Sequence, residues 1–244
     1  MSDFEQRYEI VRRRIEAACV RAGRAPSEIT LVAVSKTHPP EAVNAMARLG
    51  LRDFGENKAQ EARAKIPECD GRLRWHMIGH LQTNKARDAV RLFSMIHSVD
   101  SLKLAQELEK HAAAQSRRAP VLLEVNVSGE ANKFGLKPEE AVDVALAVNA
   151  LPRLELRGLM TMAPYSDDPE KSRPHFRRLV EMKRRIEERL GAPLPDLSMG
   201  MSGDFEAGIE EGATLVRIGA ALFGERLKGK SRATSDIGQG HSED

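Results

Sequence analysis

The chain has 244 residues, and 41% of them are hydrophobic but only 4% aromatic, so aliphatic side chains must fill its core. Its 38 basic and 36 acidic residues leave a net charge of +2, and the longest basic block is Arg12-Arg13-Arg14, which argues against a dedicated nucleic-acid surface. No apolar run reaches the roughly 18 residues of a membrane span, so we expect neither nucleic acid nor a membrane among its partners.

The first predicted element is an amphipathic helix over residues 3–22. Its apolar residues recur at helical spacing, and Gly23 is a typical helix end. The polar face carries both signs of charge, including Arg12 and Glu16. We therefore expect a helix docked on the outside of the domain rather than one lying on a membrane surface.

From residue 30 onward, predicted strands and helices alternate without a break. The strands are buried apolar runs rich in β-branched residues, and they cover residues 30–35, 53–55, 73–78, 95–99, 120–127, 154–160, 197–199 and 214–218. The helices cover residues 40–49, 58–65, 84–92, a segment capped by Asp100 or Ser101 and ending near 115, 138–149, 174–190, 204–211 and 220–223.

This alternation predicts an α/β fold with a parallel sheet covered on both faces. Eight strand-helix units predict a closed (β/α)₈ TIM barrel with an extra N-terminal helix, and a doubly wound open sheet is the alternative. We expect one barrel domain over residues 1–227. Residues 228–244 are rich in glycine, serine and charge, which predicts a disordered tail.

Lys36 follows the first strand, which Pro39 and Pro40 then close. In a parallel barrel the chemistry lies at the carboxyl ends of the strands. Desolvation at a strand mouth would lower the pKa of this amine, and such an amine can form a Schiff base with an aldehyde. Taken alone, the stretch also fits a lysine that merely marks where a strand surfaces.

The carboxyl ends of the other predicted strands are polar and glycine-rich, whereas the amino ends carry nothing comparable. Gly200 and Gly203 flank Ser202 just before a helix, and Gly219 follows the last strand. Such loops let backbone N–H groups approach an anion, and the loops after strands seven and eight are the frequent phosphate site of these barrels. The alternative is that Ser202 only caps a helix; the closeness of strands one and eight, which would bring Lys36 nearby, weakens it.

Other candidate chemistries have weaker support. His76 and His80 are four residues apart but straddle a strand end, which favours packing or hydrogen-bonding histidines over metal ligands. Cys19 and Cys69 form no CxxC pattern and predict free thiols in a reducing compartment. With no signal peptide in view, we expect a cytoplasmic protein.

Several runs together resemble the pyridoxal phosphate homeostasis protein family, which in turn resembles the barrel domain of alanine racemase. The resemblance extends to about Arg226 and rests on Val34-Ser35-Lys36-Thr37, Phe54-Gly55-Glu56-Asn57, residues 75–85, Lys133-Phe134-Gly135, Leu156-Arg157-Gly158-Leu159-Met160, residues 197–204 and Val216-Arg217-Ile218-Gly219. One departure is Gly203, which stands between Ser202 and Asp204 where the family form reads Met-Gly-Met-Ser-Asp. It leaves open which backbone amides would touch a phosphate.

The resemblance implies a Schiff base between Lys36 and pyridoxal 5′-phosphate (PLP), a form of vitamin B6. It implies that Ser202, Gly203 and Gly219 hold the phosphate and that Arg217 faces the pyridine nitrogen. The remaining cofactor-binding residues that it implies are Asn57, His80 and Met201.

The function implied is intracellular PLP homeostasis without significant catalysis, with delivery of the cofactor to PLP-requiring apoenzymes. Because no large exposed apolar stripe is evident in the sequence, we expect a monomer. The alternative is an alanine racemase-like enzyme, which would need an opposite-face tyrosine from a second domain and a partner subunit. The sequence ends soon after the last predicted strand and holds only Tyr8 and Tyr165, so we expect no racemase. A Schiff-base aldolase is less favoured still, because its chemistry needs no phosphate anchor.

Overall fold

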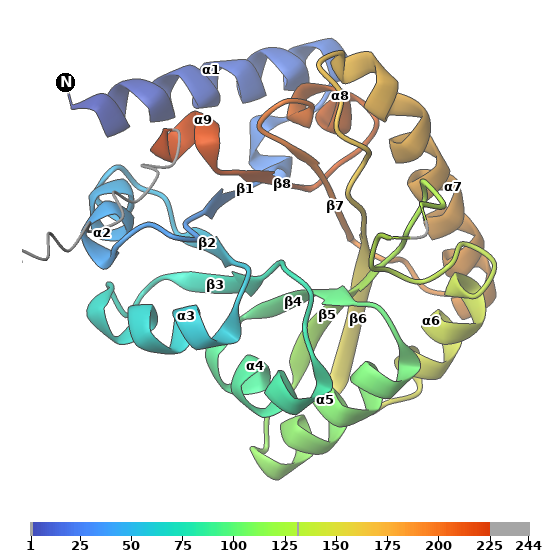
Figure 1. Ribbon diagram of the computed structural model, residues 1–244. Helices are drawn as coiled ribbons and strands as arrows, with labels where there is room; N and C mark the ends of the chain where they lie inside the picture. The colour runs from blue at the N-terminus through green and yellow to red at the C-terminus, as the bar shows by residue number, and fades with distance from the viewer. Residues whose placement is uncertain (1, 131, 225–244) are drawn as a thin grey trace, which may run out of the picture.

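Eight parallel strands form a closed barrel in sequence order in the computed structural model, which describes residues 2–130 and 132–224 (Figure 1). The strands are β1 Thr30–Val34, β2 Asp53–Glu56, β3 Arg74–Met77, β4 Met95–Val99, β5 Ala119–Glu124, β6 Leu154–Met160, β7 Asp196–Met201 and β8 Leu215–Ile218. Closure comes from the pairing of β1 with β8, where Thr30 lies opposite Leu215 and Ala33 opposite Ile218. The predicted barrel is confirmed, and the open sheet is excluded.

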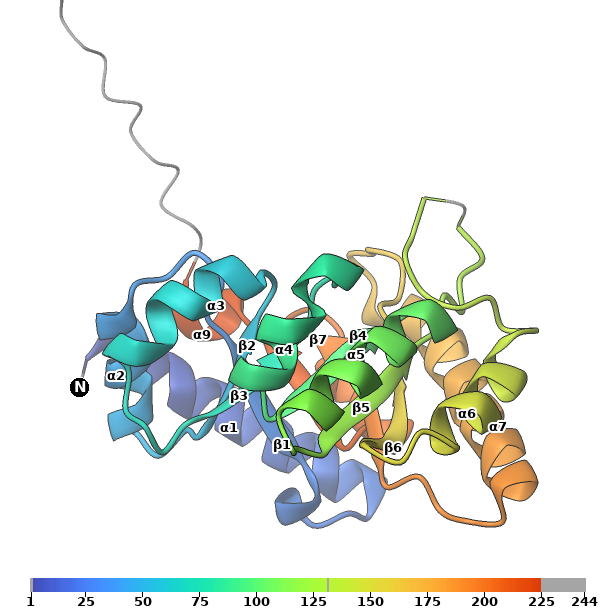
Figure 2. The same cartoon turned by 90° about the horizontal axis from the view of Figure 1, so that it is seen from below.

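Helices surround the strands on the outside. They are α1 Asp3–Ala22, α2 Pro40–Arg48, α3 Ala59–Lys65, α4 Ala86–Leu92, α5 Leu102–Ala114, α6 Ala141–Asn149, α7 Arg173–Leu190, α8 Phe205–Glu210 and α9 Ala220–Phe223, with 3-10 turns η1 Pro26–Glu28, η2 Ile66–Glu68, η3 Thr83–Lys85 and η4 Pro169–Ser172. Figure 2 views the barrel from its flank, with α3, α4 and α5 in front of the strands. Among the described helices, none has the length and apolarity needed to cross a bilayer. The tail predicted at 228–244 lies outside the described residues.

The N-terminal helix α1 docks on the barrel, as its mixed charge predicts. Ser2 and Glu5 close a capping box at its start, and Gly23 ends it with a left-handed φ of 64°. On the far side of the helix from solvent, Val11 and Ile15 are buried. Ion pairs from Arg14 to Glu206 (2.7 Å) and from Arg21 to Glu210 (2.6 Å) join it to α8, so the helix belongs to the outer layer.

Several predicted boundaries are corrected, among them the end of β5, which stops at Glu124 instead of residue 127. β1 ends at Val34, so Lys36 lies in the turn after the strand, where Thr37 takes a left-handed φ of 66°. The helix expected from residue 138 begins at Ala141, because a turn closed by the Glu140 N–H and the Lys137 carbonyl precedes it. β7 continues to Met201 instead of ending at residue 199.

The layer between strands and helices is apolar, whereas the barrel interior contains a polar group of side chains. Phe54 and Trp75 pack in the outer layer with ring centroids 5.7 Å apart. His97 on β4 lies 2.9 Å from Ser198 on β7. Because β5 and β6 separate these two strands in the barrel, that contact crosses the interior. The barrel interior is therefore polar below its carboxyl-terminal rim.

Candidate functional site

A cavity of about 500 Å³ lies at the carboxyl-terminal ends of β1, β7 and β8. The structure brings seven of the eight predicted cofactor residues into its lining, namely Lys36, Asn57, Met201, Ser202, Gly203, Arg217 and Gly219. Val34, Ile78 and Met162 add apolar walls. Residues far apart in the sequence thus form one pocket that combines an amine, a hydroxyl, a guanidinium and apolar surface.

His80 is the exception, because it does not belong to this lining. β3 ends at Met77, and Ile78 just after it lines the pocket whereas His80 does not. Its Nδ1 lies 3.0 Å from Asp100 Oδ2, and its ring stacks on Phe134 at 3.7 Å. The contact with the cofactor that the resemblance implied for His80 stays a prediction without support from this geometry.

Asn57 reaches the cavity beside a close approach of two loops. A Cβ on Gly79, in the loop after β3, would lie 2.5 Å from the carbonyl oxygen of Asn57. Only glycine lets the backbones come this near. The small residue after β3 therefore sets how close the Asn57 loop lies to the β3 loop.

The turn that carries Lys36 is held by a buried group of charges. The Lys65 ammonium donates to the Ser35 carbonyl at 2.8 Å and to carboxylate oxygens of Glu56 at 2.6 Å and Glu61 at 2.8 Å. Glu61 also accepts from the Thr37 N–H at 2.6 Å. The residues on both sides of Lys36 are thereby tied to the same ammonium-carboxylate group.

The Lys65–Glu56 pair is almost fully removed from water, since Lys65 is 6% exposed and Glu56 is 0% exposed, whereas the Glu61 side chain is partly exposed. Burial raises the pKa of Glu56, against the opposing effects of Lys65 and of the Ser35 hydroxyl, which donates to Glu56 at 2.7 Å. Lys65 was not among the residues predicted from the sequence. A lysine on a helix normally reaches solvent, but α3 packs against β2, and this lysine turns inward to Glu56 at the end of that strand.

The loop after β7 is shaped by Asp204. Its Oδ1 accepts from the Met201 N–H at 2.6 Å, and its Oδ2 accepts from the Ser172 hydroxyl at 2.8 Å. Gly200 has a φ of 91°, and a Cβ there would lie 2.8 Å from the Phe205 Cα, so the tight turn into α8 requires glycine. The Met201 amide is therefore occupied within the loop.

Ser202 and Gly219 bring the β7 and β8 loops together, because the Gly219 N–H donates to the Ser202 Oγ at 3.3 Å. The hydroxyl accepts in this contact and keeps its own hydrogen for an acceptor in the cavity. The two loops from which an anion site was predicted therefore lie next to each other, and anion binding by them stays a prediction.

Arg217 forms the base of the cavity and is 3% exposed. Its Nη1 donates to the Ser198 hydroxyl at 2.6 Å, and its Nη2 donates to the Thr161 carbonyl at 2.8 Å. Burial lowers the pKa of Arg217 to about 10, while Glu124 and Asp204 act to raise it. The guanidinium thus stays cationic at neutral pH.

Ser198 and His97, which support Arg217 from below, were also missed from the sequence. Each is a polar residue inside a short buried strand, 0% exposed. Buried polar groups need hydrogen-bond partners, so a polar residue in an otherwise apolar strand was the available signal. Nothing in the sequence says that β4 and β7 meet across the barrel.

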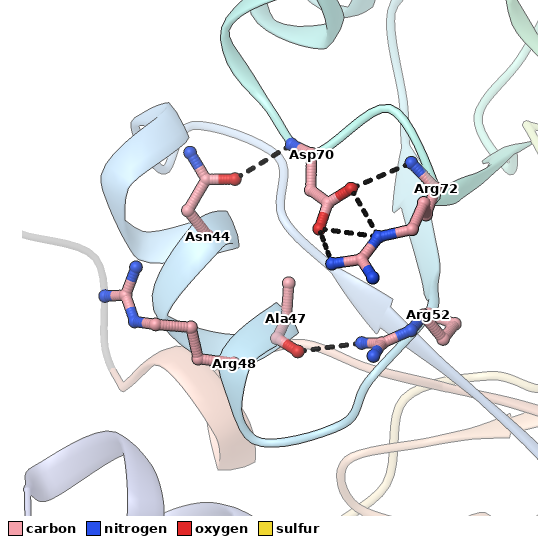
Figure 3. Close-up of a pocket in the computed structure, with 6 residues that line it drawn as sticks. All are labelled: Asn44, Ala47, Arg48, Arg52, Asp70 and Arg72. Carbon is pink, nitrogen blue, oxygen red and sulfur yellow. Dashed lines mark hydrogen bonds and ion pairs between the residues drawn. The ribbon is translucent and has the colours of Figure 1, made fainter.

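A further cavity, of about 490 Å³, contains three arginines at the opposite end of the barrel (Figure 3). Arg52 donates to the carbonyls of Ala47 and Leu51, both at 2.8 Å. Arg72 is paired with Asp70 at 2.7 Å. Because two of its arginines already serve local contacts, this cavity is a weaker candidate than the one at the carboxyl-terminal rim.

Glu124 ends β5 inside the protein and is 2% exposed. Its Oε2 has no hydrogen-bond partner among the described residues. Burial, together with the charge of Asp100 and against the effect of Arg217, raises its pKa to about 7. This carboxyl group does not line the cavity, but its raised pKa reflects how strongly the barrel interior excludes water.

Comparison with known proteins points to one family. Residues 11–227 match the family model for the alanine racemase N-terminal domain. The chain is 45% identical to the pyridoxal phosphate homeostasis protein of Aquifex aeolicus (strain VF5) over 222 residues, or 91% of this chain and 97% of that protein.

Solved structures agree with this. PipY of Synechococcus elongatus PCC7942, with PLP bound, matches with a TM-score of 0.77 at 35% identity, over 86% of this chain and 100% of that one. An alanine racemase of Clostridium difficile 630 matches with a TM-score of 0.69 at 18% identity, over 88% of this chain and 56% of that one. The second likeness shows a shared fold alone, and the roles of individual residues stay predictions.

Lys65→Met tests the charge group around the Lys36 turn. The variant leaves Glu56 buried without its cation, and loss of one partner of a buried pair costs about 3 kcal/mol of unfolding free energy. Urea titration measures that loss. Lys58→Met makes the same change at an exposed residue beside the same helix and should stay within about 0.5 kcal/mol of the parent. Equal stability of the two variants would contradict a structural role for Lys65.

Glu124→Gln tests the buried carboxyl. In the folded protein the pKa of Glu124 is about 7, whereas its ordinary value is 4.5. Between these two pH values the folded state holds a proton that the unfolded state releases, so the free energy of unfolding falls as pH rises. The free energy of unfolding of the variant, relative to that of the parent, should therefore rise by about 3 kcal/mol between pH 4.5 and pH 7. Unfolding titrations at several pH values measure this, with Glu139→Gln at an exposed position as the control. Parallel pH profiles for parent and Glu124→Gln would rule the shift out.

Proposed function

The chain belongs to the pyridoxal phosphate homeostasis protein family, and we propose that it binds PLP in the carboxyl-terminal cavity as a Schiff base on Lys36. The observation that carries this proposal is the convergence of Lys36, Ser202 and Arg217 on one pocket. PipY, 35% identical over its whole length, was solved with PLP bound.

The residues present fit this cofactor. When bound, PLP supplies an aldehyde for an amine, together with an electron-withdrawing ring. Lys36 offers the amine, and the corner of Ser202 and Gly219 offers a hydroxyl donor for a phosphate. Val34, Ile78 and Met162 offer apolar contact to the ring, and a cavity of about 500 Å³ falls within the usual range for small-molecule sites.

Arg217 supports a carrier rather than a catalyst. A cation next to the pyridine nitrogen disfavours protonation of that nitrogen, and an unprotonated ring withdraws electrons less well. The structure keeps this cation fixed, since Ser198 and the Thr161 carbonyl accept its hydrogen bonds. The residue that binds the ring would thus also restrain carbanion chemistry.

The two tyrosines of the chain are poor candidates for the second base of a racemase. Tyr8 packs on the outer apolar layer from α1. Tyr165 borders the cavity but is 92% exposed, and its hydroxyl donates to Asp167 at 2.8 Å, a bond that raises its pKa. A tyrosine whose pKa is raised gives up its proton less readily, which argues against a racemase.

We therefore propose a non-catalytic protein of PLP homeostasis that holds the cofactor reversibly and releases it to PLP-requiring apoenzymes. Tyr165, at the edge of the cavity, is solvent-exposed, so the cavity opens to solvent there. An open cavity suits exchange of the cofactor with other proteins. The cytoplasmic location and the monomeric state expected from the sequence stay predictions.

Borohydride reduction tests the Schiff base. The protein loaded with PLP should be yellow, lose its colour on reduction, and carry the pyridoxyl group on the peptide that contains Lys36. Peptide mass spectrometry identifies the modified lysine, and Lys36→Ala should fail to become coloured while remaining folded by circular dichroism. Reduced protein in which Lys36 is unmodified would end the proposal.

Turnover assays separate a carrier from an enzyme. The loaded protein, incubated with L-amino acids, should racemise or transaminate them no faster than free PLP at the same concentration. Chiral chromatography measures both reactions. Turnover far above that of free PLP, and abolished by Lys36→Ala, would establish an enzyme instead.

A further inference from the structure

A continuous chain of hydrogen bonds runs from Arg217 through the barrel interior. Arg217 Nη1 donates to Ser198 Oγ at 2.6 Å, and that oxygen lies 2.9 Å from His97 Nδ1. The other ring nitrogen of His97, Nε2, lies 2.9 Å from His76 Nδ1. His76 Nε2 lies 3.0 Å from Asp53 Oδ1. All five side chains are buried.

The chain joins the two ends of the barrel. Arg217 lines the cavity at the carboxyl-terminal rim. Asp53 and His76 line a different cavity of about 340 Å³, to which Arg74 also contributes. Asp53 and Arg74 are the first residues of β2 and β3, so this second cavity lies at the amino-terminal end. At that end Asp53 is paired with the Arg74 guanidinium.

The donors of the chain all point in one direction because its two ends are fixed. Arginine can only donate, so Ser198 Oγ accepts from it and has its own hydrogen to give to His97 Nδ1. His97 must then carry its proton on Nε2 and donate to His76 Nδ1. His76 likewise carries its proton on Nε2 and donates to the Asp53 carboxylate, which can only accept.

The pKa shifts of Asp53 and His97 agree with this direction. Burial would raise the pKa of Asp53, but hydrogen bonds from His76 and Arg74 outweigh burial and hold that pKa below its usual value. Burial, with His76 and Arg217 nearby, holds the pKa of His97 well below its usual value, so its ring is neutral.

The reverse direction fails on the same contacts. If His97 donated from Nδ1, Ser198 would have to accept from both His97 and Arg217. The serine hydrogen would then have no acceptor among the described residues, and an unsatisfied buried donor is costly.

We propose that Ser198, His97 and His76 are positioning residues for Arg217. They form a one-way hydrogen-bonded chain that fixes the guanidinium beneath the cofactor cavity and anchors it to Asp53 at the opposite end of the barrel. The effect on PLP rests on the proposed function, whereas the direction of the chain is a property of the protein without cofactor.

The first experiment examines the cofactor-free protein by ¹⁵N NMR of its histidine rings at neutral pH. A scalar coupling across the N–H···N bond should identify the His97–His76 pair, with the proton on His97 Nε2 and with both rings unprotonated at Nδ1. A proton on Nδ1 of either ring, or a doubly protonated ring, would overturn the one-way chain without reference to PLP.

The second experiment compares two serine-to-alanine variants in buried strands. Ser198→Ala removes the link between Arg217 and His97. Ser98→Ala removes an equally buried hydroxyl, 0% exposed, whose oxygen has no hydrogen-bond partner among the described residues. The expectation is that Ser198→Ala changes the ring ¹⁵N shifts of His97, shifts the absorption of bound PLP and weakens PLP binding about tenfold, the effect of losing one hydrogen bond to a charged group. Ser98→Ala should match the parent in all three measurements.

The outcomes separate the two proposals. If the parent protein fails to bind PLP while the histidine tautomers are as stated, the proposed function is wrong and the one-way hydrogen-bonded chain is supported. If PLP binds to the parent protein and Ser198→Ala behaves like Ser98→Ala, the hydrogen-bonded chain does not position Arg217 and this inference is wrong.

Discussion

The burial of the Arg217 guanidinium inside a parallel barrel is the constraint on which the arrangement of the site depends. A charge out of water needs hydrogen-bond acceptors around it, and apolar side chains cannot supply them. The interior below the cavity is accordingly polar, with Ser198 and the Thr161 carbonyl in direct contact with Arg217. The apolar core instead lies between the strands and the helices.

Lys36 is positioned in a different way, although it is also a basic residue at the same rim. Arg217 is held through its own side chain, whereas the turn around Lys36 is held through the backbone. The carbonyl of Ser35 and the N–H of Thr37 bind the Lys65–Glu61 pair. A fixed guanidinium suits recognition of a ring, and an amine on a fixed turn suits reversible covalent attachment.

The fold does not decide between carrier and enzyme. The alanine racemase of Clostridium difficile shares the barrel at 18% identity, and one fold commonly hosts several activities. What separates them must lie in the groups around the cavity. Here the exposed Tyr165 and the fixed cation of Arg217 both favour holding a cofactor over activating a substrate.

The sequence by itself determined the barrel and most of the rim. Strand and helix periodicity is local, and a parallel barrel places the carboxyl ends of all its strands on one rim, so the order of residues alone assigns Lys36, Ser202 and Gly219 to one pocket. Contacts between side chains of different elements were decided only by the tertiary structure. Lys65 turns inward because α3 packs against β2, and His97 meets Ser198 because closure brings β4 opposite β7. His80 contacts Asp100 and is not part of the cavity lining. Each of these depends on distances between elements far apart in the chain, which no local pattern encodes.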